Sequence, residues 1–190
     1  MPLPTFDALW QHLDTATRSR SPCNFLQLAT AGLDGAPQVR TVVLRQADRQ
    51  AGSLSFVTDM RSPKVAEIGR DPRVSLLCYD PAANTQLRLS GTASLLREDA
   101  ERRAFWQSLR GRTLALFEAP HAPGTEIGED GQPLLQEQPR EPDADPFERF
   151  QPVTVTLSRL EWLDLSAEPH LRCLYRRTDD GGWKGTRLSP

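Results

Sequence analysis

Apolar and polar residues alternate along several stretches of the chain, a period typical of strands that are buried on one face. Residues 24–32 (NFLQLATAG) alternate in this way. Residues 37–46 (PQVRTVVLRQ) follow after an Asp34-Gly35 turn, so the two stretches predict a hairpin. A turn at 49–52 then leads to a third strand at 53–59. Further strands are expected at residues 73–80, 85–96, 152–165, 170–177 and 183–188.

Three stretches instead carry apolar residues at helical spacing: residues 4–18, 62–71 and 98–109. The second has clear start signals, because Ser62 is a good N-cap and Pro63 suits the first helical position. The expected helices are few beside the strands, and the strand connections are of the hairpin type. This pattern indicates a small antiparallel barrel with helices at its rim.

Residues 121–150 differ from the rest of the chain. They hold many prolines and acidic residues, which predicts an extended connecting loop. A chain of 190 residues is long enough for one domain and too short for two comfortable ones, so residues 1–190 are expected to form a single domain.

The composition excludes several classes of protein. The net charge of −2 gives no support for nucleic-acid binding, and no apolar run approaches the length of a membrane span. The N-terminus does not resemble a secretory signal, so the protein is predicted to be cytoplasmic. Cys23, Cys78 and Cys173 are widely spaced and the histidines lack ligand spacing, which predicts buried free thiols and no metal site.

Positive charge gathers where a predicted strand ends and the second predicted helix begins. Thr58 ends the strand and Ser62 precedes the helix, with Arg61 and Lys64 beside them and Arg40 on the preceding strand. Helix N-termini present unpaired N–H groups and partial positive charge, which a phosphate dianion requires. The pattern predicts a phosphate site, with a solvated charged rim as the alternative.

Several motifs in this order resemble the flavin-binding pattern of the pyridoxamine 5′-phosphate oxidase family. The motifs are RTVVLR (40–45), FVTDMRSPK (56–64), QLRLSG (86–91), HLRCLYRR (170–177) and WKGTRLSP (183–190). The resemblance covers residues 24–96 and 153–190. It implies a mainly β fold, an FMN-binding split β-barrel of antiparallel, Greek-key type with peripheral helices. It also implies FMN as the cofactor and a homodimer with FMN at the subunit interface.

The resemblance assigns the phosphate end of FMN to one group of residues. Arg40, Thr58, Ser62 and Lys64 would hold the phosphate, with Arg61 nearby. Arginine supplies paired donors for such a group, and lysine supplies a point charge.

A second group would contact the flavin ring. Val42 and Val57 would line the ring, and Arg45, where the family commonly has Lys, would stand near its pyrimidine end. Gln86 and Arg172 match flavin contacts lent by the second subunit. Purely structural roles for Arg45 and Gln86, and a solvent-facing Arg172, remain the alternatives. Because Arg40 and Arg45 fall on opposite faces of a regular strand, only a bulge would bring both to one site.

The chain departs from the family pattern at the substrate. His170 is kept as a candidate substrate contact, but Glu168 and Pro169 occupy the region where the family places an arginine. A carboxylate there would repel a phosphorylated substrate. In the family, a Tyr, an Arg and a Ser from one helix contact the substrate phosphate. The corresponding positions in this chain are Phe105, Leu109 and Thr113, so two of the three are apolar.

These observations predict an FMN-dependent oxidoreductase that transfers hydride between flavin N5 and a small organic substrate. No residue is a convincing catalytic acid or base. The alternatives are a genuine pyridoxamine 5′-phosphate oxidase and a flavin-binding protein without turnover of its own.

Overall fold

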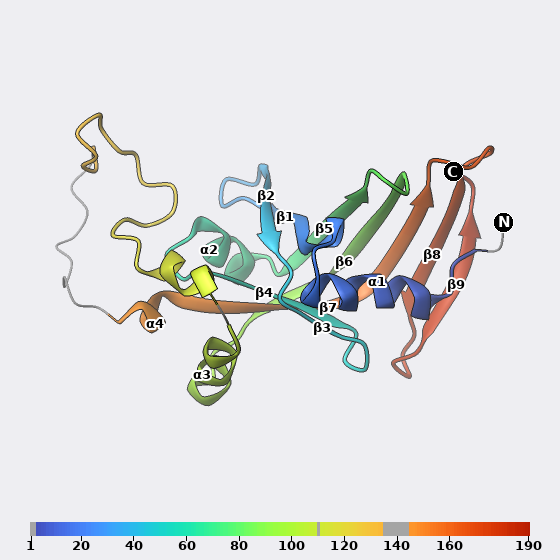
Figure 1. The fold of residues 1–190 in the computed structure, drawn as a ribbon, viewed down its shortest axis with the longest axis horizontal. Coiled ribbons are helices and arrows are strands. Elements are labelled where there is room, and N and C mark those ends of the chain that lie inside the picture. The colour runs from blue at the N-terminus through green and yellow to red at the C-terminus, as the bar shows by residue number, and fades with distance from the viewer. Residues whose placement is uncertain (1–2, 110, 135–144) are drawn as a thin grey trace.

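The computed structural model describes residues 3–109, 111–134 and 145–190. Strands of these residues join in one antiparallel sheet (Figure 1), so the predicted mainly β, antiparallel class is confirmed. The strands are β1 (Phe25–Ala31), β2 (Pro37–Val43), β3 (Gln46–Asp48), β4 (Ser53–Asp59), β5 (Arg73–Asp80), β6 (Thr85–Leu95), β7 (Phe150–Asp164), β8 (Leu171–Arg177) and β9 (Trp183–Leu188). Each predicted strand is present. The short β3 was not separated from β2 in the sequence.

The strands follow the order β2-β1-β5-β6-β7-β4-β3, and β8 pairs with both β7 and β9. The long strand β7 explains this branching. One edge pairs with β6, whereas the other pairs first with β4 and then with β8. The register of β6 and β7 shifts between Ser90 and Gly91. A Cβ on Gly91 would lie 2.1 Å from the carbonyl oxygen of Thr156, so only glycine fits this irregularity.

The chain crosses from one part of the sheet to another directly after β2. The Leu44 N–H donates to the Asn24 carbonyl, and the next N–H, that of Arg45, donates to the Ser55 carbonyl on β4, both at 2.8 Å. Successive residues therefore bind η1 before β1 and then β4, which brings the end of β2 against β4. This crossing positions the residues of the site described below.

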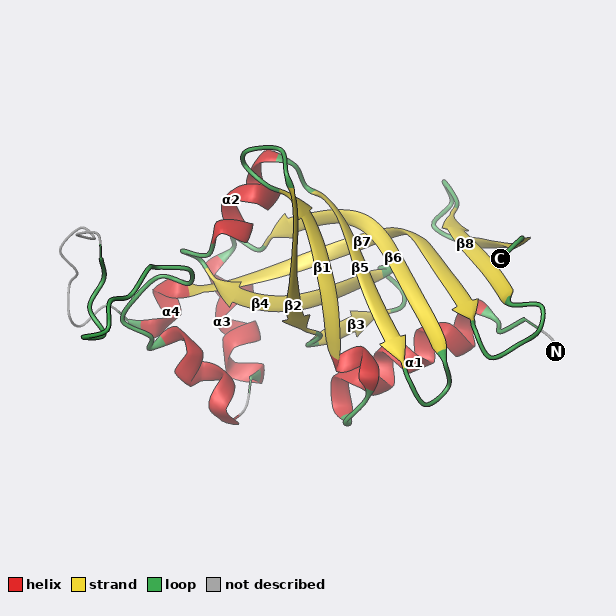
Figure 2. Cartoon of the chain, turned by 90° about the horizontal axis from the view of Figure 1, so that it is seen from above, coloured by secondary structure: helices red, strands yellow, loops and turns green. Residues whose placement is uncertain are grey.

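Helices flank the sheet (Figure 2), and α1 packs across one of its faces rather than at the rim alone. They are α1 (Phe6–Arg18), α2 (Pro63–Arg70), α3 (Asp99–Ser108) and α4 (Pro146–Arg149), with 3-10 turns η1 (Pro22–Asn24) and η2 (Gly111–Phe117). Of the predicted loop 121–150, residues 121–134 carry only an isolated bridge between Ile127 and Pro133, and residues 135–144 lie outside the described part. The predicted end of the loop was wrong, because residues 146–149 form α4 and β7 begins at Phe150. None of the described helices has the length and apolar character needed to cross a bilayer.

The main core lies between α1 and the sheet. Leu9, Trp10 and Leu13 of α1 are buried against the strands, and Phe6 of the same helix stacks on Trp183 of β9 with ring centroids 4.6 Å apart. A second, aromatic cluster lies under α3, where Phe105, Phe117, Phe147 and Phe150 are buried together. Helix α3 contributes Phe105 to this cluster, and its Arg102 donates to the Phe147 and Phe150 carbonyls beside it.

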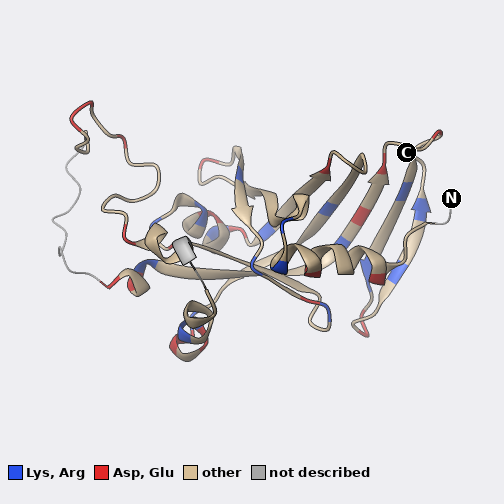
Figure 3. Cartoon of the chain, in the orientation of Figure 1, with Lys and Arg blue, Asp and Glu red and all other residues tan. Residues whose placement is uncertain are grey.

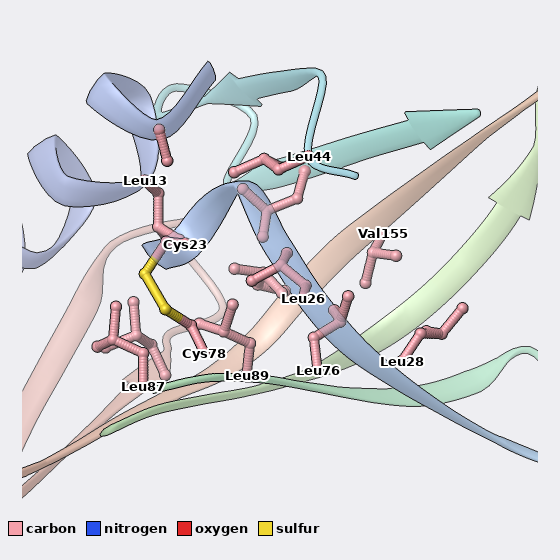
Figure 4. Close-up of a cluster of buried hydrophobic side chains, with 14 of the residues drawn as sticks. Leu13, Cys23, Leu26, Leu28, Leu44, Leu76, Cys78, Leu87, Leu89 and Val155 are labelled. Atoms are coloured by element: carbon pink, nitrogen blue, oxygen red, sulfur yellow. A yellow bond between two sulfur atoms is a disulfide. The ribbon is translucent and has the colours of Figure 1, made fainter. Parts of the chain in front are cut away.

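The cysteines correct one expectation. Cys23 and Cys78 form a disulfide with Cα atoms 5.3 Å apart (Figure 4), so the prediction of free thiols was wrong for this pair. The bond joins η1 to β5 within the main core. The sequence separation of 55 between the two cysteines hid the pairing, because only the sheet register brings β5 beside β1. Cys173 is a buried free thiol, as predicted.

Candidate functional site

Four predicted site residues gather where β4 ends and α2 begins. Thr58 is buried near the end of β4, Ser62 occupies the N-cap position of α2, and Lys64 lies in the first helical turn. Arg40 reaches toward this group from β2. We call Arg40, Thr58, Ser62 and Lys64 the α2 cradle.

The lysine of the cradle is held in place by its two hydroxyl neighbours. The Lys64 ammonium donates to Thr58 Oγ1 at 2.9 Å and to the Ser62 hydroxyl. Although Ser62 is the N-cap residue by position, its side chain makes no capping hydrogen bond to the helix. Burial lowers the pKa of Lys64, and the nearby Arg40 charge lowers it further, while Glu67 and Asp59 oppose the shift. The ammonium is thus desolvated and aligned, and no carboxylate of the described residues pairs with it directly.

Two residues that were not among the predicted site residues, Thr30 and Glu67, hold the Arg40 side chain in place. The Arg40 guanidinium donates to Glu67 Oε2 of α2 at 2.7 Å and also to Thr30 Oγ1. Thr30 in turn donates to the same Glu67 oxygen at 2.6 Å, and both residues are buried. A hydrogen-bonded ion pair of this kind fixes the plane of a guanidinium. The signal in the sequence was weak: Glu67 lies three residues after Lys64 on α2.

Arg61 lies at the edge of this group. It pairs with Asp59, whose carboxylate accepts from the Arg61 guanidinium and from its backbone N–H at 2.8 Å. Burial raises the pKa of Asp59, but the hydrogen bonds and charge of Arg61, together with Arg149, outweigh it and lower that pKa. The guanidinium of Arg61 also donates to the carbonyls of Ala119 and Pro120. Arg61 therefore ties the segment after η2 to the loop before α2.

The predicted ring contacts lie beside the cradle on β2 and β4. Val42 is buried and shares the inward face of β2 with Arg40, and Val57 lies partly buried near the end of β4, against the aromatic cluster. The β1–β2 register is regular from Phe25 to Ala31, so no bulge unites Arg40 and Arg45. Instead, the crossing after β2 carries Arg45 toward η2.

Arg45 is a partly buried cation with an unusual set of partners. It donates to Thr113 Oγ1 of η2 at 3.0 Å, and its buried Nε has no hydrogen-bond partner in the described part of the chain. Burial lowers the pKa of this guanidinium. Among the described residues no carboxylate pairs with it. An unpaired desolvated cation is costly, which is a typical sign of an anionic ligand.

Gln86 and Arg172 lie away from the cradle, because they are beside Leu163 near one end of β7, whereas Thr58 of the cradle is beside Gln151 near the other end. They are brought together by register, because Gln86 of β6 is opposite Leu163 of β7 and Leu163 is opposite Arg172 of β8. Within one chain, the predicted site residues thus form two groups at different places in the fold.

A buried carboxylate holds Arg172. Glu161 of β7 is 1% exposed and accepts from Arg172 Nε at 3.0 Å, and it also pairs with Arg88 and Arg159. Burial raises the pKa of Glu161, but the arginines outweigh it and lower that pKa. The alternative was that Arg172 simply faces solvent. In the structure its guanidinium is instead held by Glu161. Glu161 could not be singled out from the sequence, because its contacts depend on β6, β7 and β8 lying side by side.

His170 lies outside both groups. It is exposed, and its Nδ1 lies 3.0 Å from the Ala167 carbonyl, in the turn before β8 that contains Glu168 and Pro169. In the described residues no cluster of three or more potential metal ligands is present.

Comparison with known proteins places this geometry in a family. Residues 4–97 match the model of the pyridoxamine 5′-phosphate oxidase FMN-binding domain. A pyridoxine/pyridoxamine 5′-phosphate oxidase from Rubrobacter xylanophilus is 32% identical over 171 residues, covering 88% of this chain and 77% of that protein. Another from Cupriavidus metallidurans is 30% identical over 193 residues, covering 93% and 84%.

Comparison with solved structures supports the same family and fold. A pyridoxamine 5′-phosphate oxidase-related, FMN-binding protein from Nostoc punctiforme superposes with a TM-score of 0.77 at 29% identity and covers both chains completely. PhzG from Burkholderia lata shares the fold, with a TM-score of 0.70 at 24% identity over 96% of this chain and 89% of that one. The chain belongs to the pyridoxamine 5′-phosphate oxidase family, and its fold is the family's FMN-binding split β-barrel.

The residues of the cradle fit the cofactor of this family. Two cations and two hydroxyls surround the start of a helix, which is a donor set for a phosphate dianion. The unpaired Arg45 guanidinium suits the carbonyl-rich end of a flavin ring or an anionic substrate.

Proposed function

We propose that the protein is an FMN-dependent oxidoreductase that acts on a small organic substrate as a homodimer. The observation that carries the proposal is the α2 cradle, a preorganised phosphate-binding set in a chain of an FMN-binding family. When bound, FMN would supply the redox chemistry by exchanging a hydride at N5. The protein would supply binding, orientation and charge.

Arg40 and Lys64 would bind the FMN phosphate, with the hydroxyls of Thr58 and Ser62 completing its hydrogen bonds. Glu67 would keep the Arg40 guanidinium in one plane, which reduces the entropy lost when the phosphate binds. Arg61 would close the edge of the site through its contacts with the Ala119 and Pro120 carbonyls.

The ring would extend from the cradle along β2 and β4. Val42 and Val57 would present apolar surface to it, while Arg45 would place positive charge at its pyrimidine end. Thr113 holds that guanidinium from the η2 side. Because reduced flavin carries negative charge at this end, Arg45 would favour the reduced state.

The homodimer is supported by the separation of the two groups of residues. Gln86 and Arg172 lie beside the opposite end of β7 from the cradle in one chain, so a second copy would have to supply them to the same flavin. Two-fold pairing is the commonest way to join two such patches. A cytoplasmic location stays a prediction, and the Cys23–Cys78 disulfide would be unusual there.

The substrate would differ from a pyridoxamine phosphate. Phe105 is buried in the aromatic cluster, Leu109 packs against that cluster, and Thr113 is engaged by Arg45, so α3 and η2 offer little to a second phosphate. Glu168 adds a carboxylate close to His170, the candidate substrate contact. The second candidate function is pyridoxamine 5′-phosphate oxidation. It is supported by the similarity to the pyridoxine/pyridoxamine 5′-phosphate oxidases from Rubrobacter xylanophilus and Cupriavidus metallidurans.

One assay separates the two candidates. FMN-loaded protein would be mixed with pyridoxamine 5′-phosphate under air, and pyridoxal 5′-phosphate formation would be followed by absorbance, with a Lys64→Ala variant as the flavin-deficient control. The proposal predicts no pyridoxal 5′-phosphate formation above that control. It also predicts that other small organic donors reduce the bound flavin in an anaerobic screen. Steady pyridoxal 5′-phosphate production would establish the second candidate.

A further inference from the structure

One face of the sheet formed by β6–β9 is rich in positive charge. Directly paired residues of antiparallel strands project to the same side, so the register assigns this face, which is opposite the face that α1 covers. Figure 3 shows basic residues on each of these strands. The charged residues of this basic face are Arg88, Arg159, Glu161, Arg172, Arg176 and Lys184.

Three of these cations form a row across neighbouring strands. Arg159 of β7 is directly opposite Arg176 of β8, and Arg176 is directly opposite Lys184 of β9. Like charges in directly opposed positions are destabilising. Glu161 compensates Arg159, but neither Arg176 nor Lys184 forms an ion pair with another described residue. Both are exposed, so an anion from outside the chain would relieve their repulsion.

The shape of the face indicates the kind of anion. Small-molecule sites are enclosed pockets, whereas the row lies on an open sheet surface. Next to Arg159, which is directly opposite Ser90, a shallow depression of about 400 Å³ is lined mainly by small residues, among them Ser75, Ser90 and Thr92, and also by Arg73. A depression of this type suits an extended polypeptide segment better than a compact ligand.

The chain itself carries such a segment at the other end of the molecule. Residues 118–134 include exposed acidic residues, which are Glu118, Glu126, Glu129 and Asp130. Its Ile127–Pro133 bridge presents Glu129 and Asp130 at a turn. Both views place this segment beyond α2, far from β8 and β9 (Figures 1 and 2), so it does not reach the basic face of its own chain.

We propose that the basic face binds the acidic segment 118–134 of a second copy of this chain. The inference rests on the homodimer of the proposed function, in which the cradle end of one copy meets the Arg172 end of the other. Arg61 already ties the segment to the cradle through the Ala119 and Pro120 carbonyls. The dimer that completes the flavin site would therefore also bring opposite charges together, twice in a two-fold assembly.

Charge reversal on each side tests this contact. The basic variant is Arg176→Glu with Lys184→Glu, the acidic variant is Glu126→Lys with Glu129→Lys, and the third protein combines all four changes. All four positions are exposed, so the fold should be kept, as circular dichroism would verify. The dimer dissociation constant is measured by sedimentation equilibrium, and Arg18→Glu on the exposed end of α1 serves as the matched control.

Each reversal alone should weaken the dimer about tenfold at low salt, because exposed ion pairs contribute modestly and occur twice. The combined protein should regain wild-type affinity, and Arg18→Glu should leave it unchanged. If the protein with all four changes does not regain the wild-type dimer affinity, another anion occupies the basic face, and the proposed contact is overturned. Wild-type dimerisation in every variant would also overturn it and leave the homodimer intact. A wild-type protein that stays monomeric while binding FMN would overturn the homodimer itself.

Discussion

Replacing Lys64 by alanine should weaken the binding of FMN far more than the binding of riboflavin, which lacks the phosphate. The ammonium is already desolvated and held by Thr58 and Ser62, so a phosphate meets a prepared charge. A hydrogen bond to a charged group contributes about 1.5–3 kcal/mol. Since 1.4 kcal/mol corresponds to a factor of ten, the dissociation constant for FMN should rise roughly 10- to 150-fold.

The assay is a titration of flavin fluorescence with the protein, run in parallel for FMN and riboflavin. Arg70→Ala is the matched control: it removes a cation from the last turn of the same helix, where Arg70 is exposed and donates to the Leu33 carbonyl. That control should bind FMN as the wild type does. Equal weakening of FMN and riboflavin, or unchanged FMN affinity in Lys64→Ala, would refute the assignment of Lys64 to the phosphate.

Three further predictions concern pH and stability. FMN affinity of the wild type should fall as the pH rises through the pKa of Lys64, which burial places below 10.5, and titrations of Lys64→Ala should lack this step. Loss of the Cys23–Cys78 bond should lower the free energy of unfolding by about 4 kcal/mol in the chain-entropy model for a 55-residue separation. Urea unfolding with and without reductant measures it, and identical midpoints would contradict it. Glu161→Gln should lower the free energy of unfolding by about 1–3 kcal/mol near neutral pH, because it leaves three arginines around a neutral amide. The stabilisation by the charged Glu161 is present above the ordinary pKa of 4.5 and is lost as the pH falls through its lowered value, so the difference from wild type should vanish in acid.

The strands and helices were predictable because their signals are local. The alternation at residues 73–80 matches β5, and Ser62-Pro63 and Asp71-Pro72 mark the two ends of α2. The gathering of Thr58, Ser62 and Lys64 was also predictable, since these residues are close in the sequence. Strand alternation correctly placed Arg40 and Val42 on one face.

The partners of these residues were not predictable, because they depend on which strands meet. Glu67 matters through Arg40, which reaches it from β2, and Glu161 matters through arginines on β6, β7 and β8. The same is true of the Cys23–Cys78 bond, which requires η1 to lie beside β5. Tertiary register, and not local spacing, decides each of these pairings.

The most direct test of the central claim is a near-ultraviolet and visible absorbance spectrum of the purified protein, taken after FMN is added and the excess is removed. The account predicts that flavin bands are retained at about one FMN per chain. A spectrum without retained flavin would contradict it, because the barrel would then keep the family's fold without the family's cofactor.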